Sequence, residues 1–396
     1  MIIRHASNNG VSAPLSRWQL TVLAAGTFVV GVVGFIVPGM LTEIAADLHV
    51  SLGQAGQLTT AFALAYAIGS PIIATTTRRL DRRTVAVAGM TVFLAGMLLQ
   101  AIGGTFALVV AGRIVSALGA AAFQATAFAV AGILTAPERR ARSLALIAAG
   151  SSMATLLGVP LGLVLGGWWG WRSVMAIIAG TAILIAILLV FVLPVMTLPA
   201  ASLRETLTTF TDRRILLLLS TSALVLIPVY VVISYIGVLT ALSTRNGNAV
   251  VVASLVFGAG FVAGNRVVGT LTDKAGARPV LTTGLTASAL AALLLTFVQH
   301  HFVLMLMVLL IIGFAGALLF VPQQHRLVSA AGTHISVVMS INGSMSYIGT
   351  ALGAIAGGAI ITTADATWLA PSAAVFAALV LAFTQLTAPE RHRANG

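Results

Sequence analysis

The chain has 396 residues, of which 59% are hydrophobic and only 8% are charged, whereas a soluble domain carries about 25% charged residues. A soluble chain of this length would form two domains, each with a charged exterior that this composition cannot supply. The net charge of +12 would suggest nucleic acid in a soluble protein, but here the basic residues stand in short loops between apolar runs, where they set membrane orientation. Composition therefore predicts a polytopic membrane protein whose partner is the lipid bilayer and not nucleic acid.

Apolar runs long enough to cross a bilayer recur along the whole sequence. A spanning helix needs about 20 apolar residues, and lipid offers no hydrogen-bond partner to any other open backbone structure. The alternation expected of barrel strands is missing, so the predicted fold class is an all-α membrane protein. The twelve predicted spans are 18–41, 52–76, 84–103, 105–134, 142–167, 171–193, 215–240, 248–272, 279–298, 302–324, 335–361 and 366–387. The first is too long for the hydrophobic part of a signal peptide and is expected to remain in the mature protein.

The widest break in hydropathy separates the sixth run from the seventh. It predicts an amino-terminal six-helix bundle over 1–193, a cytoplasmic linker over 194–214 and a carboxy-terminal six-helix bundle over 215–396. The two bundles are expected to be pseudo-symmetric.

The basic residues are distributed unequally between the two sides of the membrane. Of the 21 lysines and arginines, Arg113 and Arg266 lie inside runs, and only Arg172 and Arg245 fall on the side opposite the termini. Because cytoplasmic loops carry the excess of Lys and Arg, both termini are predicted to be cytoplasmic.

A glycine pattern in the fifth run recurs in the eleventh. Gly158, Gly162, Gly166 and Gly167 match Gly349, Gly353, Gly357 and Gly358 at one constant offset, and the turn at 78–83 matches the turn at 273–278. Such repeats are typical of alternating-access transporters. The alternative is a chance match between glycine-rich membrane helices.

The turn after the eighth run contains a spaced set of glycine and charged residues: Gly269, Asp273, Lys274, Gly276 and Arg278. This set resembles the loop signature of the major facilitator superfamily, G-x-x-x-D-[RK]-x-G-x-[RK], which implies a role in gating. Gly269 would let a helix approach closely, and Asp273 would lie against the amino terminus of an adjoining helix. The plainer interpretation is an ordinary cytoplasmic turn.

The matching turn in the first half departs from the family's form. Ala74, Arg78 and Asp81 replace the first glycine, the aspartate and the second glycine, and only Arg82 and Arg83 keep the basic end. The resemblance therefore does not carry a latch over to this turn.

An arginine lies about eight residues inside the fourth run. Arg113, Ser116 and Gly119 resemble the superfamily's fourth-helix motif R-x-x-[QS]-x-x-G. A charge at this depth is costly unless it faces a cavity or a partner, so a functional role is the default hypothesis. The alternative is an arginine that snorkels to the surface, which would need a reach of roughly 12 Å at 1.5 Å per residue.

The fifth run resembles the antiporter signature of the same superfamily. Gly158, Pro160, Gly162, Gly166 and Gly167 fall on the motif G-x-P-x-G-x(3)-G-G. The glycines would present a smooth face for close packing, and Pro160 would remove a hydrogen bond and permit a bend. Ordinary small-residue packing is the alternative. The chain is similar to the twelve-span drug:proton antiporter branch, which includes chloramphenicol-resistance and sugar-efflux-like permeases.

This resemblance implies a central cavity lined by the first, fourth, seventh and tenth helices, with a contribution from the second, fifth, eighth and eleventh. The implied substrate pathway contains Arg113 and aromatic or polar side chains at similar depth: Phe35, Tyr230, Tyr235, Phe314 and Asn342, with Phe62, Tyr66 and Tyr347 as further candidates.

The acidic residues limit the substrate and the coupling. All 9 of them fall at helix ends or in loops, so a buried cation would find no counter-charge, and a neutral or anionic solute is expected. Proton coupling would have to use Glu43, Asp47, Asp273 or the substrate itself.

The function that the resemblance implies is secondary active transport in the inner membrane. We expect a monomer that exports a small solute, such as chloramphenicol or a sugar-like metabolite, by alternating access, driven by the proton gradient and without a cofactor. An uptake or uniport permease of the same fold, including a passive facilitator, stays open as the alternative.

Enzymatic and metal-binding functions are not expected. The only lysine, Lys274, follows Asp273, so a Walker A lysine is missing, and the sequence contains neither HExxH nor GxSxG. The pair His300 and His301 supplies too few ligands for a metal site.

Overall fold

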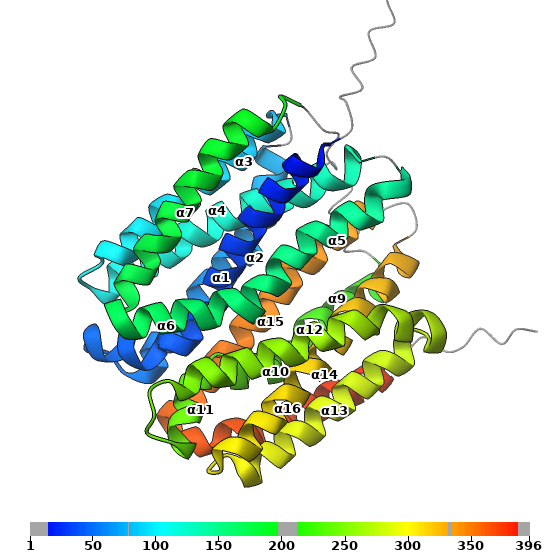
Figure 1. The fold of residues 1–396 in the computed structure, drawn as a ribbon. Helices are drawn as coiled ribbons and strands as arrows, with labels where there is room; N and C mark the ends of the chain where they lie inside the picture. The colour runs from blue at the N-terminus through cyan, green and yellow to red at the C-terminus, as the bar shows by residue number, and fades with distance from the viewer. Residues whose placement is uncertain (1–14, 78, 136, 197–211, 332–334, 387–396) are drawn as a thin grey trace, which may run out of the picture.

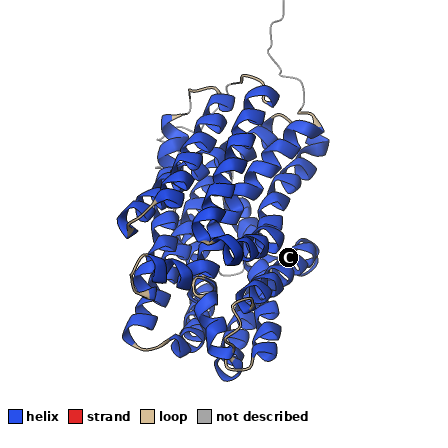
Figure 2. Cartoon of the chain, turned by 60° about the vertical axis from the view of Figure 1, so that its left-hand side comes forward, coloured by secondary structure: helices blue, strands red, loops and turns tan. Residues whose placement is uncertain are grey.

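The computed structural model describes residues 15–77, 79–135, 137–196, 212–331 and 335–386, and its regular elements in these ranges are all helical (Figure 2). Twelve helices in the described part are long and apolar enough to cross a membrane. The predicted twelve spans and the all-α class are thereby confirmed. Most of the predicted linker, both chain ends and Arg78 lie outside the described residues.

The first half forms six spans. They are α1 (Arg17–Asp47), α2 (Leu52–Thr76), α3 (Arg82–Ile102), α4 (Phe106–Ile133), the fifth span made of α5 (Pro137–Met153), a π-helical turn (Ala154–Gly158) and α6 (Val159–Trp169), and α7 (Trp171–Val192). Ser16 and Ser51 begin α1 and α2 with complete capping boxes, in which serine and a glutamine three residues later satisfy each other's backbone N–H groups.

The second half forms six more. They are the seventh span made of α9 (Arg213–Leu224), α10 (Ile227–Ile233) and α11 (Ile236–Ser243), then α12 (Ala249–Ala275), α13 (Ala277–Val298), α14 (Phe302–Ala330), α15 (Ile335–Thr363), and a final span made of a 3₁₀ turn (Ala366–Trp368) and α16 (Leu369–Leu386). The seventh run, predicted as one helix, is therefore interrupted twice.

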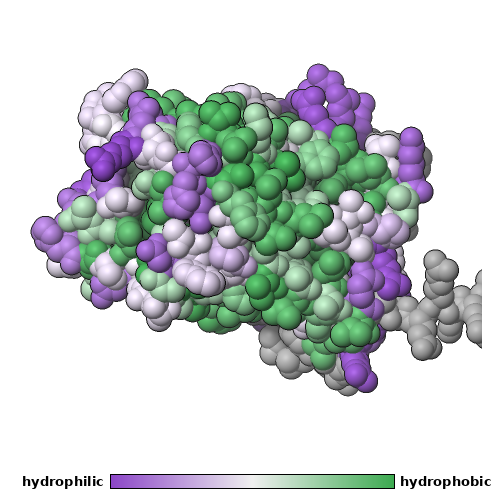
Figure 3. Space-filling view, turned by 90° about the horizontal axis from the view of Figure 1, so that it is seen from below, coloured by the Kyte–Doolittle hydropathy of each residue, from purple (hydrophilic) through white to green (hydrophobic). Residues whose placement is uncertain are grey.

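The two ends of the molecule differ in charge. We call the end at which α1 begins and α16 ends the basic end, because it holds Arg17, Arg83, Arg142, Arg214 and Lys274, among others, and we call the opposite one the far end. Figure 3 shows an apolar surface on one face, with hydrophilic side chains gathered toward its margins. Large exposed side chains such as Phe191 and Phe297 are apolar, as lipid contact requires.

Each half packs as a bundle, and the two bundles lie side by side (Figure 1). In the first, α3 packs on α4 and α7, α2 on α4, and α1 on α5; in the second, α14 packs on α12 and α13, and α15 on α10. The bundles meet where α2 runs along α15, where the middle of the fifth span touches α12, and where α1 touches α11.

Glycines permit the closest contacts between the bundles. A Cβ at Gly53 would lie 2.4 Å from Thr362 Cγ2, and one at Gly258 would lie 2.9 Å from the Thr155 carbonyl oxygen. A Cβ at Gly237 would lie 3.4 Å from the Gly39 carbonyl oxygen. The bundles are therefore in direct contact at the far end and near the centre.

The fifth span contains the irregularity that its proline predicts. Pro160 has no N–H to donate, and just before it the helix widens into the π turn Ala154–Gly158, in which the Val159 N–H bonds to the Ala154 carbonyl oxygen. This turn is part of the fifth span's contact with α12, so the proline shapes a surface between the bundles.

Candidate functional site

Arg113 is a fully buried charge about two turns inside α4 (Phe106–Ile133). Its exposed fraction is 0%. Its Nε donates to the Leu58 carbonyl oxygen of α2 at 3.2 Å, and one terminal nitrogen, Nη1, donates to the Val33 carbonyl oxygen of α1 at 3.1 Å. The guanidinium carbon lies 4.5 Å from the centre of the Phe62 ring. Three helices of the first bundle therefore hold one cation in place.

This arginine is not fully satisfied. Its second terminal nitrogen, Nη2, is buried without a hydrogen-bond partner among the described residues, and no carboxylate in the described ranges pairs with the guanidinium. An unpaired buried donor costs about 1 to 3 kcal/mol, and more when it is charged. The Arg113 Nη2 can therefore donate a hydrogen bond to an added acceptor or anion.

Aromatic rings from both bundles close over this position. Tyr66 of α2 stacks on Tyr347 of α15 with ring centres 3.8 Å apart, and Phe62 lies 6.3 Å from the same Tyr347 ring. A second pair of rings also joins the two bundles: Phe35 of α1 stacks on Tyr230 of α10 with ring centres 6.3 Å apart. We call Arg113 with these five rings the central cluster. The Phe62 ring links the two parts of this cluster, because it lies against the guanidinium of Arg113 and beside the Tyr347 ring of the other bundle.

The residues of the fourth-helix motif lie on two faces of α4. Ser116 Oγ bonds to the Arg113 carbonyl oxygen and accepts from Gln100 of α3, while a Cβ at Gly119 would lie 2.2 Å from the Phe93 backbone nitrogen. Ser116 and Gly119 therefore bring α3 close, and Arg113 faces α1 and α2. The motif's spacing follows from this double packing.

Some of the predicted pathway residues do meet. Arg113, Phe35 and Tyr230 belong to the central cluster, and so do Phe62, Tyr66 and Tyr347. Depth in the membrane and helix number were sufficient signals for these positions. They could not show that Tyr347 lies against Tyr66, because that contact depends on the register between two bundles.

Tyr235 and Phe314 lie outside the central cluster. Tyr235 begins α11, is completely buried, and donates its hydroxyl proton to the Ala354 carbonyl oxygen at 3.0 Å. Phe314 packs in a separate cluster with Val268 and Val280. Phe314 is a packing residue of the second bundle, because the face of α14 that carries it turns toward α12 and α13. Tyr235 lies between the bundles, since its ring also fills the space beside Gly56 of α2.

Asn342 lies between the central cluster and the basic end. It lines a cavity of about 10 Å³ with Ser222, Gln323 and Ser346, among others, and its Oδ1 has no hydrogen-bond partner in the described part of the chain. This volume is about the minimum for one water molecule. Asn342 is therefore near the predicted pathway but outside the aromatic layer.

Two of the three acidic candidates for proton coupling, Glu43 and Asp47, have structural contacts at the far end. Glu43 Oε1 accepts from the Trp171 backbone N–H at 3.0 Å, so it caps the start of α7. Asp47 pairs with Arg172 and accepts from the Trp171 ring nitrogen at 3.3 Å. Neither carboxylate reaches Arg113.

The loop signature after α12 is only partly explained by packing. Gly276 has φ +86°, a conformation that favours glycine, and Arg278 donates to Gln385 of α16 at 3.1 Å. Asp273 and Lys274 are exposed, and Asp273 makes no ion pair within the described ranges, with Arg266 or any other residue. The close approach expected at Gly269 is not seen, since no atom lies within 4 Å of a Cβ there.

The matching turn of the first half is built around Asp81. Its carboxylate caps α3 at the Arg83 and Thr84 N–H groups and accepts from the Met196 N–H at 2.5 Å, while the Arg82 N–H donates to the Met196 carbonyl oxygen at 2.7 Å. Burial raises the pKa of Asp81, but hydrogen bonds from Met196, Thr84 and Arg83 outweigh it and hold this pKa below its usual value. Asp81 thus ties the chain just after α7 to the start of α3.

The predicted glycine ladder packs the fifth span on α1. Cβ atoms at Gly158, Gly162 and Gly166 would lie 2.3, 2.2 and 1.9 Å from side-chain atoms of Val32, Ile36 and Met40. Gly167 has no atom within 4 Å and so has no packing role in this conformation.

Comparison with known proteins gives a family and a fold. The sequence model of the Major Facilitator Superfamily matches residues 23–265 and 223–396. The MFS-type transporter YbcL of Bacillus subtilis (strain 168) is 29% identical over 89% of this chain and 92% of its own length. The chloramphenicol resistance protein of Streptomyces lividans is 33% identical over 71% of this chain and 76% of its own length. A crystal structure of a bacterial homologue of the human lysosomal transporter Spinster, inward-facing and unoccupied, has a TM-score of 0.75 at 18% identity and covers 93% of this chain and 95% of that one.

Proposed function

Because the chain belongs to the Major Facilitator Superfamily and is a multi-pass membrane transporter, we propose that it exports a small neutral or anionic solute across the inner membrane in exchange for protons. The two bundles alternate access to the central cluster, and the basic end faces the cytoplasm. The observation that carries the proposal is Arg113, which is buried beside the contact between the bundles and has no carboxylate partner in the described part of the chain.

The charge of this site selects the solute. A cation at the central cluster would meet the guanidinium and, in the described part of the chain, no compensating carboxylate. An anion or a neutral molecule with acceptor oxygens would instead satisfy the Arg113 Nη2 and stack between aromatic rings. The tyrosine hydroxyls of Tyr66, Tyr230 and Tyr347 add polar groups to these walls.

The contacts between bundles support a moving seam. Tyr66 and Tyr347 come from opposite bundles, and so do Phe35 and Tyr230. A solute that leaves from the central cluster toward the far end must separate Gly53 from Thr362 and the central ring pairs from one another. These contacts consist of aromatic rings and small residues, and they contain no ion pair in the described ranges. The bundles can therefore separate here without leaving an unpaired charge.

The relative from Streptomyces lividans supplies a first substrate to test. It is a chloramphenicol resistance protein, and chloramphenicol is a neutral molecule with acceptor oxygens that meets the requirement of the central cluster. Export of this drug would make the chain a resistance protein as well.

The decisive experiment measures proton movement in everted vesicles with an acidic interior. Addition of chloramphenicol, related neutral drugs or small sugars is expected to dissipate the pH gradient in vesicles that contain the protein. Arg113→Ala is expected to lower the initial rate about tenfold or more, since a hydrogen bond to a charged group is worth about 1.5 to 3 kcal/mol. Arg113→Lys keeps the charge but loses the second terminal nitrogen, so we expect an intermediate rate.

Arg266→Ala is the matched control, because Arg266 also lies inside an apolar run but its side chain is exposed on α12. Its rate should stay near that of the wild type. An Arg113→Ala protein that folds and transports at the wild-type rate would remove Arg113 from the pathway.

The proton route has three side-chain candidates. We propose that Glu43, Asp47, Asp273 or the substrate itself carries the proton, because the central cluster contains no carboxylate. If the combined variant Glu43→Gln, Asp47→Asn and Asp273→Asn still couples transport to the pH gradient, the substrate is the proton carrier.

The second candidate function is uptake or uniport by the same fold. It is favoured by the absence of a carboxylate from the described residues around Arg113. Counterflow of labelled chloramphenicol without proton movement would support it and would refute antiport.

A further inference from the structure

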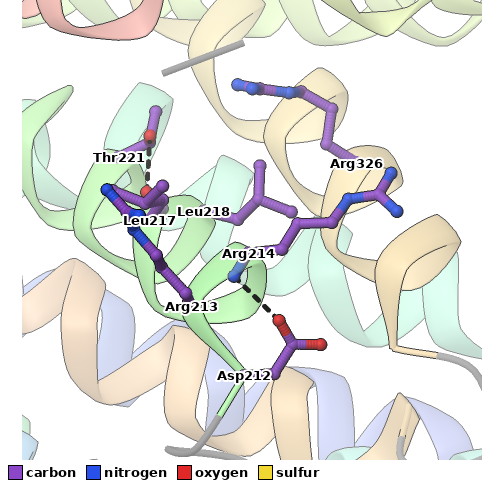
Figure 4. Close-up of a pocket in the computed structure, with 7 residues that line it drawn as sticks. All are labelled: Asp212, Arg213, Arg214, Leu217, Leu218, Thr221 and Arg326. Atoms are coloured by element: carbon purple, nitrogen blue, oxygen red, sulfur yellow. Dashed lines mark hydrogen bonds between the residues drawn. The ribbon is translucent and has the colours of Figure 1, made fainter. Parts of the chain in front are cut away.

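A pocket at the basic end of the second bundle is lined by arginines. It has a volume of about 410 Å³ and lies between the first turns of α9 and the last turns of α14 (Figure 4). Its lining consists of Asp212, Arg213, Arg214, Leu217, Leu218, Thr221 and Arg326. This volume is within the usual range for small-molecule sites, about 300 to 1,000 Å³.

The three arginines of this pocket lack carboxylate partners. Within the described ranges, the only ion pair is Arg172–Asp47 at the far end. None of the three arginines of the pocket therefore forms an ion pair with a described residue. Arg326 donates to Gln323 at 3.1 Å, and the charges of Arg214 and Arg278 act on it. Like charges gathered in this way repel one another unless an anion lies among them.

The one carboxylate in the lining has another task. Asp212 Oδ1 accepts from the Arg214 N–H at 2.8 Å and from the Ile215 N–H at 3.4 Å, so it caps α9 (Figure 4). The positive charge of the arginines is thus left for an external anion. A surface that only oriented the chain in the membrane would not need a cavity between these side chains.

The rest of the pocket is apolar. Leu217 and Leu218 lie one turn deeper than the arginines, and the Thr221 hydroxyl already donates to the Leu217 carbonyl oxygen at 2.9 Å. A ligand therefore meets guanidinium groups at the mouth and leucine side chains beyond them. This order suits a phosphate group that is joined to an apolar body.

We propose that this pocket binds a phosphate-bearing anion through Arg213, Arg214 and Arg326. Guanidinium groups bind phosphate oxygens in pairs of parallel hydrogen bonds. Basic pockets between spanning helices on the cytoplasmic side hold the head groups of anionic lipids. The same chemistry would accept a soluble phosphate ester, and the source is decided by experiment. The site is separate from Arg113 and does not depend on the transport reaction.

The test measures the thermal unfolding midpoint of the purified full chain in neutral detergent. Four ligands are titrated: short-chain phosphatidylglycerol, phosphatidylcholine with the same acyl chains, glycerol phosphate and inorganic phosphate. We expect phosphatidylglycerol to raise the midpoint at concentrations at which phosphatidylcholine does not, and we expect added salt to weaken the effect. An equal response to glycerol phosphate would identify a soluble phosphate ester as the ligand class.

The variants assign the effect to the pocket. Arg326→Gln is expected to raise the apparent Kd for the responding ligand about tenfold or more, because each charged hydrogen bond contributes about 1.5 to 3 kcal/mol. Arg213→Gln, at an exposed position, gives the same information if Arg326→Gln fails to fold. Arg142→Gln is the matched control, since Arg142 is an exposed arginine at the basic end of the other bundle.

Two outcomes would overturn the proposal. One is a response to none of the phosphate-bearing ligands. The other is an equal loss in Arg142→Gln and in the pocket variants, which would show a general attraction to basic residues. Neither outcome bears on proton-coupled export, which is measured separately in vesicles through Arg113.

Discussion

The fifth and eleventh spans carry the same spaced glycines, yet these glycines contact the neighbouring helix of their own bundle in different ways. In the first half, the ladder packs on α1, an unbroken helix of 31 residues, and meets the ends of its side chains, such as Val32 and Ile36. In the second half, it packs on α9 and α10 and meets backbone atoms: a Cβ at Gly349 would lie 2.0 Å from the Ala223 carbonyl oxygen, and one at Gly353 would lie 2.8 Å from that of Ile227.

This difference shows what an interrupted helix permits. The seventh span bends at the junctions of α9, α10 and α11, so its backbone comes within reach of α15. Tyr235, at the second junction, then fills the space beside Gly357 and bonds to α15. The contact in the first half can adjust by side-chain rotation, whereas the contact in the second half cannot do so at Gly349 and Gly353, where carbonyl oxygens of the seventh span stand in the way.

The largest expected effect is therefore at Gly349. Gly349→Ala forces a methyl group against a carbonyl group, and we expect it to lower the free energy of unfolding by about 3 kcal/mol, at the upper end of overpacking costs. Gly158→Ala, its counterpart, meets a valine methyl group that can move, and about 1 kcal/mol is expected. Unfolding midpoints in detergent give both values.

Gly167→Ala serves as the control for this pair, because open space surrounds that position. Its midpoint should remain unchanged or rise slightly, as alanine is the better helix former. Equal losses at Gly349 and Gly158 would contradict the contrast between the two contacts.

The paired turns at the basic end give the next effect. Gly276, before α13, has φ +86° and ψ 155°, whereas Asp81, at the matching position before α3, has φ −58°. Gly276→Ala places a side chain in a conformation that only glycine adopts readily, at a cost of about 2 kcal/mol. Gly170→Ala, with φ +80°, should behave like Gly276→Ala in the same unfolding measurement. A Gly276→Ala protein as stable as the wild type would show that the turn relaxes.

The smallest expected effect concerns the pH dependence of Asp81. Its pKa in the folded state is lowered, so its contribution to stability is complete above the pKa of the unfolded chain, about 3.9, and is lost as the pH falls through the folded-state value. Asp81→Asn keeps a capping oxygen but removes the negative charge at the start of α3, so we expect it to lower the free energy of unfolding by about 0.5 kcal/mol at pH 7, after solvent screening. The two proteins should become equally stable in acid.

Unfolding midpoints of both proteins between pH 3 and pH 7 provide the measurement. Asp212→Asn is a comparison at the cap of α9, where the carboxylate accepts from the α9 backbone alone among the described residues. A difference at Asp81 that stays constant down to the lowest pH would rule out the proposed titration.

Local sequence was sufficient for the elements and for part of the site. Hydropathy placed twelve spans, because each spanning helix must satisfy its own backbone in lipid. The depth of Arg113 in its run marked it as a buried charge, and the position of Pro160 marked the irregular fifth span. These features depend on one segment at a time.

Only the tertiary structure decided which side chains meet. Tyr230 and Tyr235 are five residues apart in similar sequence surroundings. Tyr230 nevertheless belongs to the central cluster, whereas Tyr235 donates a hydrogen bond from the start of α11 to α15. Phe314 has suitable depth and helix number but faces the interior of its own bundle. Likewise, no local pattern shows that α9 and α14 leave a pocket among three arginines. The rotation of each helix about its axis is set by close packing with its neighbours, and that information is distributed over both halves of the chain.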